Sequence, residues 1–269
     1  MAGIKWIGSN PENPFKHNLP RASALTVLND PVTKLPVAVM DGTVISAMRT
    51  GAATGVAAKY LARENSSVLC LIGAGVQNRT QMKAVLAVCP NVSEVFVYDI
   101  DFGRAQKFAE ETSASENIKV TPLKEAKEGV CKADVIVTAT MATAPIVEKD
   151  WIQDGCFFAN VAGYEYTFDA LKSADKIVVD RFSEIIHRKH STLALMVIEG
   201  LLSEKDVYAS LGEVVNKKKQ GRETPEERIY FNSVGMGIED IAIAARIYRE
   251  AKKSGLGVEL SLWENPLWI

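Results

Sequence analysis

Apolar runs alternate with helix-length segments through the middle of the chain. Runs with the length and composition of buried strands lie at 68–73, 94–99, 117–121, 133–140, 155–163 and 175–180. Strands that alternate with helices are typical of a parallel, doubly wound sheet. The pattern therefore predicts an α/β domain with a doubly wound parallel sheet, over residues 63–231.

Residues 1–40 follow a different pattern. The runs ASALTVLN and LPVAVM flank a turn, which predicts a hairpin in an antiparallel or mixed sheet. The next stretch, 41–63, is rich in Ala and Gly and has apolar residues at helical spacing. Asp41 or Thr43 is suited to cap this helix. Its small residues predict close packing, as in a helix that crosses between two domains.

The last third of the chain reads as mostly helical. Residues 181–230 are charged, and the stretch NKKKQGRETPEER within them predicts an exposed loop. The final stretch, GIEDIAIAARIYREAKKSGLG, predicts an amphipathic helix that Gly255 ends. With the hairpin, this helix predicts a smaller α+β domain made of residues 1–62 and 232–269.

Composition and charge narrow the possible functions. The chain has 269 residues, of which 47% are hydrophobic and 24% charged, as in ordinary globular proteins. Its formal net charge of −2 gives no general attraction to nucleic acid or anionic membranes, and its apolar runs are too short to cross a bilayer. The four cysteines are scattered without a C-x-x-C pair, so no metal site or disulfide framework is predicted. No signal peptide is visible, and we expect a cytoplasmic protein.

Residues 66–88, SSVLCLIGAGVQNRTQMKAVLAV, read as a strand, a tight glycine turn and a helix. Gly73 permits the turn, and Gly75 lets the backbone approach a pyrophosphate at the helix N-terminus. Asn78 replaces the third glycine of the dinucleotide fingerprint, at a position that mainly serves helix–strand packing. The order of the elements predicts a dinucleotide site. The alternative is a doubly wound domain that binds nothing.

Two later strands add candidate cofactor contacts. Asp99 ends the second strand, 26 positions after Gly73, where an acid accepts hydrogen bonds from the ribose. A carboxylate there repels a 2′-phosphate and favours NAD over NADP, although Arg104 lies close enough in sequence to offset this. After the fourth strand, Thr138 and Thr140 stand where the nicotinamide side of the cofactor usually passes.

The chain resembles the ornithine cyclodeaminase/mu-crystallin family along essentially its whole length, in the stretches IKWIGS, LNDPVTKLPVAVMDGTVISAMRTGAA, LIGAGVQNRTQ and NSVGMGIEDIA. The resemblance implies a homodimeric oxidoreductase that acts on amino-acid C–N bonds, with a Rossmann-like NAD-binding domain. The smaller domain then binds substrate and dimerises through the hairpin sheet. GIKWIGS, Arg21 in PRASA and GMGIED look most like a siderophore-pathway branch. That branch converts N-(2-amino-2-carboxyethyl)-L-glutamate to 2,3-diaminopropionate and 2-oxoglutarate.

Two features depart from the family pattern. Members usually carry several dozen residues, including a substrate-contacting arginine, before the lysine that matches Lys5. Here Met1 stands almost against that motif, and we expect a fragment, a misplaced start or a protein that has lost part of its pocket. Ornithine cyclodeaminases also have an Asp-x-Pro-Gly turn whose aspartate handles the substrate amine. This chain has Glu165 in GYEYT and no Pro-Gly, which argues against ornithine cyclisation.

Hydride removal from an amino acid requires a clamped carboxylate, a deprotonated amine and a Cα–H that faces the nicotinamide. The resemblance assigns Lys5 and Arg49 to the carboxylate, and Arg21 could hold a further carboxylate of a di- or tri-acid substrate. Glu165 is the candidate general acid or base, and Lys5 is counted as catalytic with it. Each of these residues also has a structural interpretation. Lys5 could be a surface lysine beside Trp6, and Arg49 a helix arginine paired with an acid. Arg21 could be a surface charge of the hairpin, and Glu165 a solvated loop residue.

The predicted cofactor contacts combine the glycine turn, the strand ends and the segment that the resemblance puts beside the nicotinamide. They are Thr50, Gly73, Gly75, Val76, Gln77, Asp99, Ile100, Thr138, Ala139, Thr140, Val234 and Gly235. NAD is the predicted cofactor.

Other functions stay open. Within enzymes, the chain could be an ornithine cyclodeaminase, an alanine dehydrogenase or a ketimine reductase. In another class, it could be a non-catalytic binder of NADPH and a small ligand, as mu-crystallin-like members can be. Asp99 argues against NADPH.

Overall fold

The computed structural model describes residues 1–161 and 163–265 and divides into two compact units. Unit 1 comprises Met1–Ser46 and Gly237–Ile269, and unit 2 comprises Ala47–Met236. The division falls inside helix α1 (Thr43–Leu61), which contributes to both units. The predicted domain boundaries, 62/63 and 231/232, stay a prediction. Residues 266–269 of the smaller predicted domain, and residue 162 of the fifth predicted strand, lie outside the described residues.

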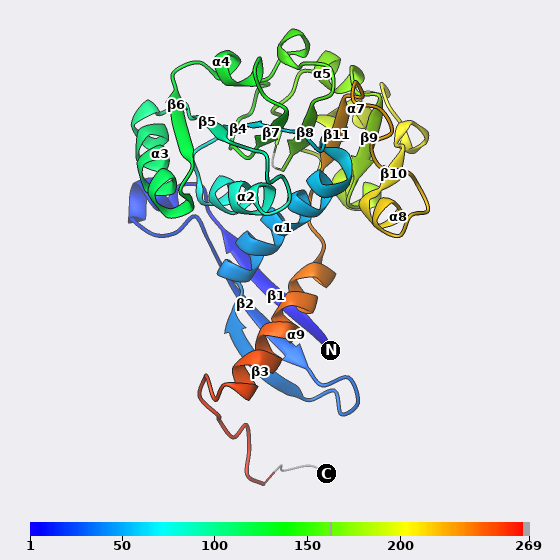
Figure 1. Ribbon diagram of the computed structural model, residues 1–269. Coiled ribbons are helices and arrows are strands. Elements are labelled where there is room, and N and C mark those ends of the chain that lie inside the picture. The colour runs from blue at the N-terminus through cyan, green and yellow to red at the C-terminus, as the bar shows by residue number, and fades with distance from the viewer. Residues whose placement is uncertain (162, 266–269) are drawn as a thin grey trace. The chain divides into compact units, whose positions relative to one another are not determined.

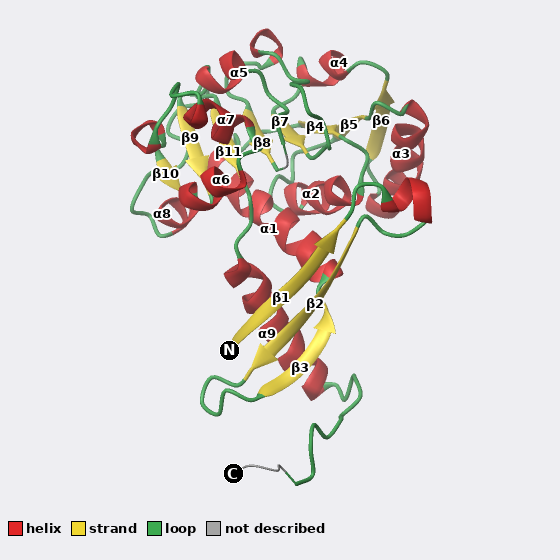
Figure 2. Ribbon diagram, turned by 180° about the vertical axis from the view of Figure 1, so that it is seen from behind, coloured by secondary structure: helices red, strands yellow, loops and turns green. Residues whose placement is uncertain are grey.

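Unit 1 is an antiparallel sheet with one helix on it (Figure 2). The strands β1 (Ala2–Ser9), β2 (Ala22–Asn29) and β3 (Pro36–Asp41) lie in that order, with a short π-helical turn, η1 (Asn13–His17), after β1. Helix α9 (Gly237–Lys253) packs against one face, where Leu28, Ile45, Ala244 and Ala245 form a buried cluster. The predicted hairpin and final helix are present, and β1 extends the hairpin to three strands.

The inward face of β1 explains why that strand was not predicted. Its inward positions carry Gly3, which lies against Ile241 of α9, and Lys5, which is hydrogen-bonded to Asp240. Ile7, at the next inward position, is apolar but 46% exposed, so the strand contributes little apolar surface to the core. Asp41, the last residue of β3, caps α1 as predicted, since its Oδ1 accepts a hydrogen bond of 2.8 Å from the amide of Thr43.

The opposite face of this sheet is apolar and exposed. Strand register aligns Ile4 with Val27 and Val39, and Trp6 with Leu25. Ile4, Trp6, Leu25 and Val39 are 63%, 75%, 48% and 67% exposed, respectively. We call these residues and Val27 the outer sheet face.

Unit 2 is built on an eight-stranded parallel sheet, as the alternating pattern predicts. The strand order is β10-β9-β11-β8-β7-β4-β5-β6. The strands are β4 (Val68–Ile72), β5 (Glu94–Tyr98), β6 (Lys119–Leu123), β7 (Val135–Thr138), β8 (Phe157–Asn160), β9 (Lys176–Val179), β10 (Ala209–Ser210) and β11 (Ile229–Asn232). The chain runs outward from β4 to β6, then returns to β7 on the other side of β4, which is the doubly wound arrangement.

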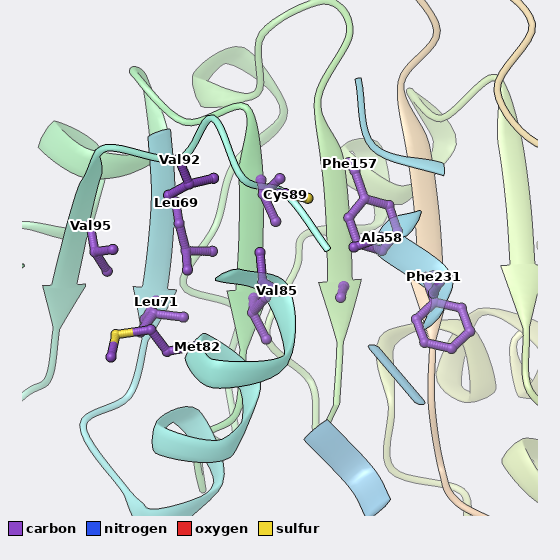
Figure 3. Close-up of a cluster of buried hydrophobic side chains, with 14 of the residues drawn as sticks. Ala58, Leu69, Leu71, Met82, Val85, Cys89, Val92, Val95, Phe157 and Phe231 are labelled. Carbon is purple, nitrogen blue, oxygen red and sulfur yellow. The ribbon is translucent and has the colours of Figure 1, made fainter. Parts of the chain in front are cut away.

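Helices cover both faces of this sheet (Figure 1). Residues of α1, α2 (Val76–Leu86), α3 (Phe102–Glu116) and α8 (Leu211–Val215) share one buried cluster. Residues of α4 (Ala126–Val130), α5 (Phe168–Lys172), α6 (Phe182–Arg188) and α7 (Thr192–Ile198) share the other. Figure 3 shows the first cluster, where Met82 of α2 lies beside Leu71 of β4. Short 3₁₀ turns, η2 (Lys149–Trp151) and η3 (Glu204–Asp206), complete the connections.

The prediction that 181–230 is helical is wrong where the segment joins the sheet. β10 pairs with β9, and β11 inserts between β9 and β8. The four residues of β11, IYFN, follow directly on a charged loop and are too short to show a period. Their strand conformation depends on partners more than fifty residues earlier in the chain.

The basic loop before β11 is exposed over most of its length, as predicted, but its end is tied to the sheet. Lys176, whose side chain is 7% exposed, forms ion pairs with Glu223 at 2.6 Å and Glu227 at 2.8 Å. Burial lowers the pKa of Lys176, and the two carboxylates outweigh this and raise it. The charges of this loop therefore fix the chain at the amino-terminal edge of the sheet.

Close approach of α1 to α2 depends on glycine. A Cβ added at Gly51 would lie 2.5 Å from the carbonyl oxygen of Thr80, and one added at Gly55 would lie 2.9 Å from that of Ala84. Real Cβ atoms do not approach backbone so closely. The small residues of 41–63 thus allow the close packing that their composition predicted.

Candidate active site

Two segments meet at the carboxyl ends of β4 and β7, where the order of the strands along the sheet reverses. Gly73 follows β4 with a φ of +102°, which favours glycine. A Cβ there would lie 2.7 Å from the carbonyl oxygen of Ala139 and 3.1 Å from Cγ2 of Thr140. The structure therefore brings three predicted cofactor residues together at the point where open α/β sheets bind ligands.

The N-terminus of α2 is suited to an anion. Gly75 stands in the N-cap position with extended backbone, and no side chain caps the helix there. A Cβ at Gly75 would meet nothing within 4 Å, and Val76 is 69% exposed. Free amide groups of a first turn, with open space before them, fit a pyrophosphate. Gln77 lies in the same turn, with its amide 3.1 Å from Thr80 Oγ1.

Asn78 ties the glycine turn to the helix. Its buried Nδ2 donates to the carbonyl oxygens of Ile72 at 2.9 Å and Gly73 at 2.6 Å. The amide thus occupies the helix–strand contact of the missing third glycine and adds hydrogen bonds that glycine lacks.

Asp99 lies directly beside the glycine turn. Its Oδ2 accepts a hydrogen bond of 2.8 Å from the amide of Ala74, and its Oδ1 accepts one of 3.0 Å from the amide of Asp101. Ile100, between the two acids, is 93% exposed. Asp101 caps α3, accepting from the amide of Arg104 at 3.3 Å. Two carboxylates at this strand end fit a ribose better than a 2′-phosphate.

Glu165 is fully buried at the carboxyl ends of β7 and β8. Its Oε2 accepts hydrogen bonds from Thr138 Oγ1 and Asn160 Nδ2, both at 2.7 Å. Its Oε1 accepts from the hydroxyl of Thr140 at 2.7 Å and from the amide of Thr140 at 2.5 Å. The structure thus brings Glu165 together with Thr138 and Thr140. Glu165 is not a solvated loop residue.

The environment of Glu165 suits proton transfer. Burial raises the pKa of this carboxyl group, and the hydrogen bonds from Thr138, Thr140 and Asn160 only partly oppose the rise. Asn160 is held in turn by Tyr230, whose hydroxyl donates to its Oδ1 at 2.8 Å. A carboxyl group with a raised pKa, fixed by a buried network, is a candidate general acid or base.

Within unit 1, Lys5 is paired with an acid. Its Nζ lies 2.9 Å from Asp240 Oδ2, which is almost fully buried, and 3.2 Å from Ser46 Oγ. Lys5 is therefore not a surface lysine beside Trp6. Arg21, which comes just before β2, is exposed, as in the structural interpretation of that residue.

Within unit 2, Arg49 lies against the turn after β11. Arg49 is 8% exposed, and a Cβ added at Gly235 would collide with its guanidinium group. Gly235 also has a φ of +78°. The structure therefore brings Arg49 and Gly235 together. Thr50, the next residue of α1, accepts a hydrogen bond of 3.4 Å from Gln81 through its carbonyl oxygen.

Asp180, at the carboxyl end of β9, was not among the predicted site residues. Its Oδ2 accepts hydrogen bonds from the amides of Val234 at 2.7 Å and Gly235 at 2.6 Å. The amide of Ser233 donates to the carbonyl oxygen of Asn160 at 3.1 Å. An acid that ends an apolar strand, as in DKIVVD, is the signal that could have pointed to this residue.

Neither a metal centre nor a membrane span is found in the described part of the chain. Residues 1–161 and 163–265 contain no group of three or more His, Cys, Asp or Glu residues arranged to hold a metal. Over the same residues, no helix combines the length and the apolar character that crossing a membrane requires.

Comparison with known proteins identifies the family. The ornithine cyclodeaminase/mu-crystallin family matches residues 1–255. The chain belongs to this family. It is 37% identical over 264 residues to the N-((2S)-2-amino-2-carboxyethyl)-L-glutamate dehydrogenase of Staphylococcus aureus, covering 98% of this chain and 78% of that protein.

Two solved structures are similar to the family member described here. One is the Δ1-pyrroline-2-carboxylate reductase of Thermococcus litoralis, in complex with NADH and L-proline, with a TM-score of 0.91 at 39% identity, covering 96% of this chain and 80% of that one. The other is an archaeal alanine dehydrogenase dimer with bound NAD. Its TM-score is 0.90 at 37% identity, and the match covers 97% of this chain and 81% of that one. The family and fold class predicted from sequence are confirmed.

Proposed function

We propose that this protein is an NAD-dependent oxidoreductase that oxidises an amino-acid C–N bond to an imine, which is then hydrolysed. The substrate we propose is N-(2-amino-2-carboxyethyl)-L-glutamate, and the products are 2,3-diaminopropionate and 2-oxoglutarate. The observation that carries the proposal is the buried Glu165, whose carboxyl group is hydrogen-bonded at the strand ends beside the glycine turn. The dehydrogenase of Staphylococcus aureus with this activity in its name supports the choice of substrate.

The NAD site is proposed from the residues around the glycine turn. The pyrophosphate would lie on the first turn of α2 at Gly75 and Val76, and the ribose would bind Asp99. Because the amides of Ser233, Val234 and Gly235 donate to Asn160 and Asp180, a hydrogen bond between the backbone of this turn and a ligand would use a carbonyl oxygen. An acceptor there suits the amino group of the nicotinamide carboxamide. When bound, NAD would accept the hydride from the substrate Cα.

The substrate contacts are proposed for each residue separately. Arg49 would hold the α-carboxylate with its planar fork, and Lys5 would add a second positive charge. Arg21 would bind a further carboxylate. Glu165 would take the proton of the substrate amine as the hydride leaves Cα, and the resulting imine would be hydrolysed by water to the amine and the 2-oxo acid.

A homodimer in the cytoplasm is part of the same proposal. The outer sheet face is a contiguous apolar surface on unit 1, of the kind that marks a protein interface. The archaeal alanine dehydrogenase is a dimer, which supports a second copy of this chain as the partner.

Alanine dehydrogenase and ketimine reductase remain the second candidates, because relatives with alanine dehydrogenase and pyrroline-2-carboxylate reductase activity in their names are about as similar as the first. Ornithine cyclisation is less well supported, since Glu165 replaces the aspartate of the Asp-x-Pro-Gly turn.

One assay separates these functions. Purified protein is given NAD and, in turn, N-(2-amino-2-carboxyethyl)-L-glutamate, alanine, proline and ornithine, and NADH is followed by absorbance. We expect NADH only with the first compound. Arg49→Ala should lower kcat/KM with that compound and leave NADH binding intact. NADH formation with alanine alone, or ammonia release from ornithine, would replace the proposed substrate.

A further inference from the structure

Asp180 joins the end of β9 to the turn that follows β11. One carboxylate oxygen, Oδ2, accepts from the amides of Val234 and Gly235 and lies 3.4 Å from the hydroxyl of Ser233. The other oxygen, Oδ1, accepts from the amide of Arg181 at 2.6 Å. Asp180 is 6% exposed, so these hydrogen bonds are shielded from water. An amide left without a partner in such a buried place lowers the stability of the fold.

The turn that Asp180 holds is also the surface against which Arg49 lies. Gly235 leaves room for the guanidinium group only because it lacks a Cβ. Gly235 has a positive φ of 78°, and in this conformation its amide donates a hydrogen bond to Asp180 Oδ2. Displacement of the turn therefore changes the space available to Arg49.

We propose that Asp180 is a positioning residue: it fixes the Ser233–Gly235 turn, and through Gly235 it fixes the guanidinium group of Arg49 for the substrate carboxylate. This inference rests on the proposed function of Arg49. In this proposal Asp180 acts through the turn and Arg49, and not by direct contact with the substrate. The carboxylate of Asp180 accepts the hydrogen bonds of the amides of Val234 and Gly235.

The test compares the two carboxylates that flank β9, Asp175 before it and Asp180 after it. Asp180→Asn removes the charge and one acceptor oxygen at the carboxyl end of β9. Asp175→Asn is the matched control, because Asp175 accepts a hydrogen bond of 2.8 Å from the amide of Arg228 at the amino end of that strand. We expect Asp180→Asn to lower kcat/KM for the amino-acid substrate by about 100-fold, the size of effect that a misplaced binding group causes. The control should keep the wild-type kcat/KM and bind NADH as the wild type does.

A double-mutant cycle with Arg49→Lys separates positioning from general support of the fold. If Asp180 acts through Arg49, Asp180→Asn lowers kcat/KM little further when Arg49→Lys is already present, so the two losses of kcat/KM do not add. Additive losses, or equal losses in both Asp→Asn variants, overturn the proposal. If Asp180→Asn does not fold, Gly235→Ala asks the same question with Asp180 intact, since the new methyl group displaces the guanidinium. Wild-type kcat/KM in that variant would also overturn it.

A measurement that needs no turnover distinguishes this inference from the proposed function. Phenylglyoxal modifies accessible arginines, and mass spectrometry reports the rate at Arg49. Asp180→Asn should raise that rate, while Asp175→Asn should not. If no panel compound is oxidised, the proposed function fails, and an unchanged rate at Arg49 would in addition refute the role of Asp180.

Discussion

Glu165 carries a carboxyl group into the interior of unit 2, where four donor groups from Thr138, Thr140 and Asn160 surround it. None of the donors is a cation, so the ionised form is stabilised by dipoles alone. Burial outweighs them and raises the pKa. The folded protein therefore holds a proton on Glu165 more tightly than the unfolded chain does.

This raised pKa has a predictable effect on stability. The contribution of Glu165 is fully present below its ordinary pKa of 4.5 and is lost as the pH rises through the higher pKa of the folded state. Glu165→Gln does not titrate. We therefore expect the urea midpoint of Glu165→Gln, relative to wild type, to increase as the pH rises above 4.5 and then to level off.

The same variant should lose activity. Removal of a general acid or base lowers kcat by about 10²–10⁴-fold. Glu148→Gln is the control, because Glu148 is exposed on the same unit and should change neither kcat nor the pH dependence of the urea midpoint. A pH profile of stability that is the same for wild type and Glu165→Gln would contradict the raised pKa.

Sequence position located some of these side chains and not others. Glu165, Asp99 and the threonines follow apolar strands, and parallel strands bring their carboxyl ends to one edge of the sheet. Asp180 also ends a strand, but its importance depends on two backbone amides more than fifty residues later. Hydrogen bonds between distant backbone and side chain leave no pattern in the sequence.

At the scale of elements, long periodic segments were predictable, whereas short ones depended on their partners. The glycine turn, α1, α9 and the central strands have recognisable composition or period. β11 has four residues and becomes a strand only because β8 and β9 lie on either side of it. β1 was missed because its inward face carries Gly3 and Lys5 in place of apolar residues.

The crossing of α1 and α2 can be tested by adding one methyl group. Gly51→Ala improves helix propensity by about 1 kcal/mol, but it forces a Cβ onto the backbone of Thr80. Such overpacking costs about 1–3 kcal/mol, so we expect a net loss of up to about 2 kcal/mol in the free energy of unfolding, measured in urea.

The matched control for this substitution is in α8. A Cβ at Gly212 would meet nothing within 4 Å, so Gly212→Ala should stay within about 1 kcal/mol of wild type. If Gly51→Ala is as stable as Gly212→Ala, the two helices can separate at no cost, and the close approach is not needed.

For the whole molecule, the remaining question is what covers the outer sheet face. Its apolar residues come from all three strands of unit 1, and the opposite face already packs on α9. An exposed apolar surface of this kind favours association with a partner. A second copy of the chain, related by two-fold symmetry, would bury the same face of both subunits.

A single charge on this face should weaken the proposed dimer. Val39 lies on β3, at one edge of this face, in register with Val27 and Ile4, and is 67% exposed. Val39→Glu places an unpaired carboxylate in the proposed interface twice, once from each subunit, and should weaken the dimer by about 100-fold or more in Kd. Analytical ultracentrifugation over a range of concentrations measures this shift. Ile247→Glu makes the same change on α9, where Ile247 is 44% exposed, and should leave the dimer intact. Dissociation in both variants, or a dimer unaffected by Val39→Glu, would assign the interface to another surface.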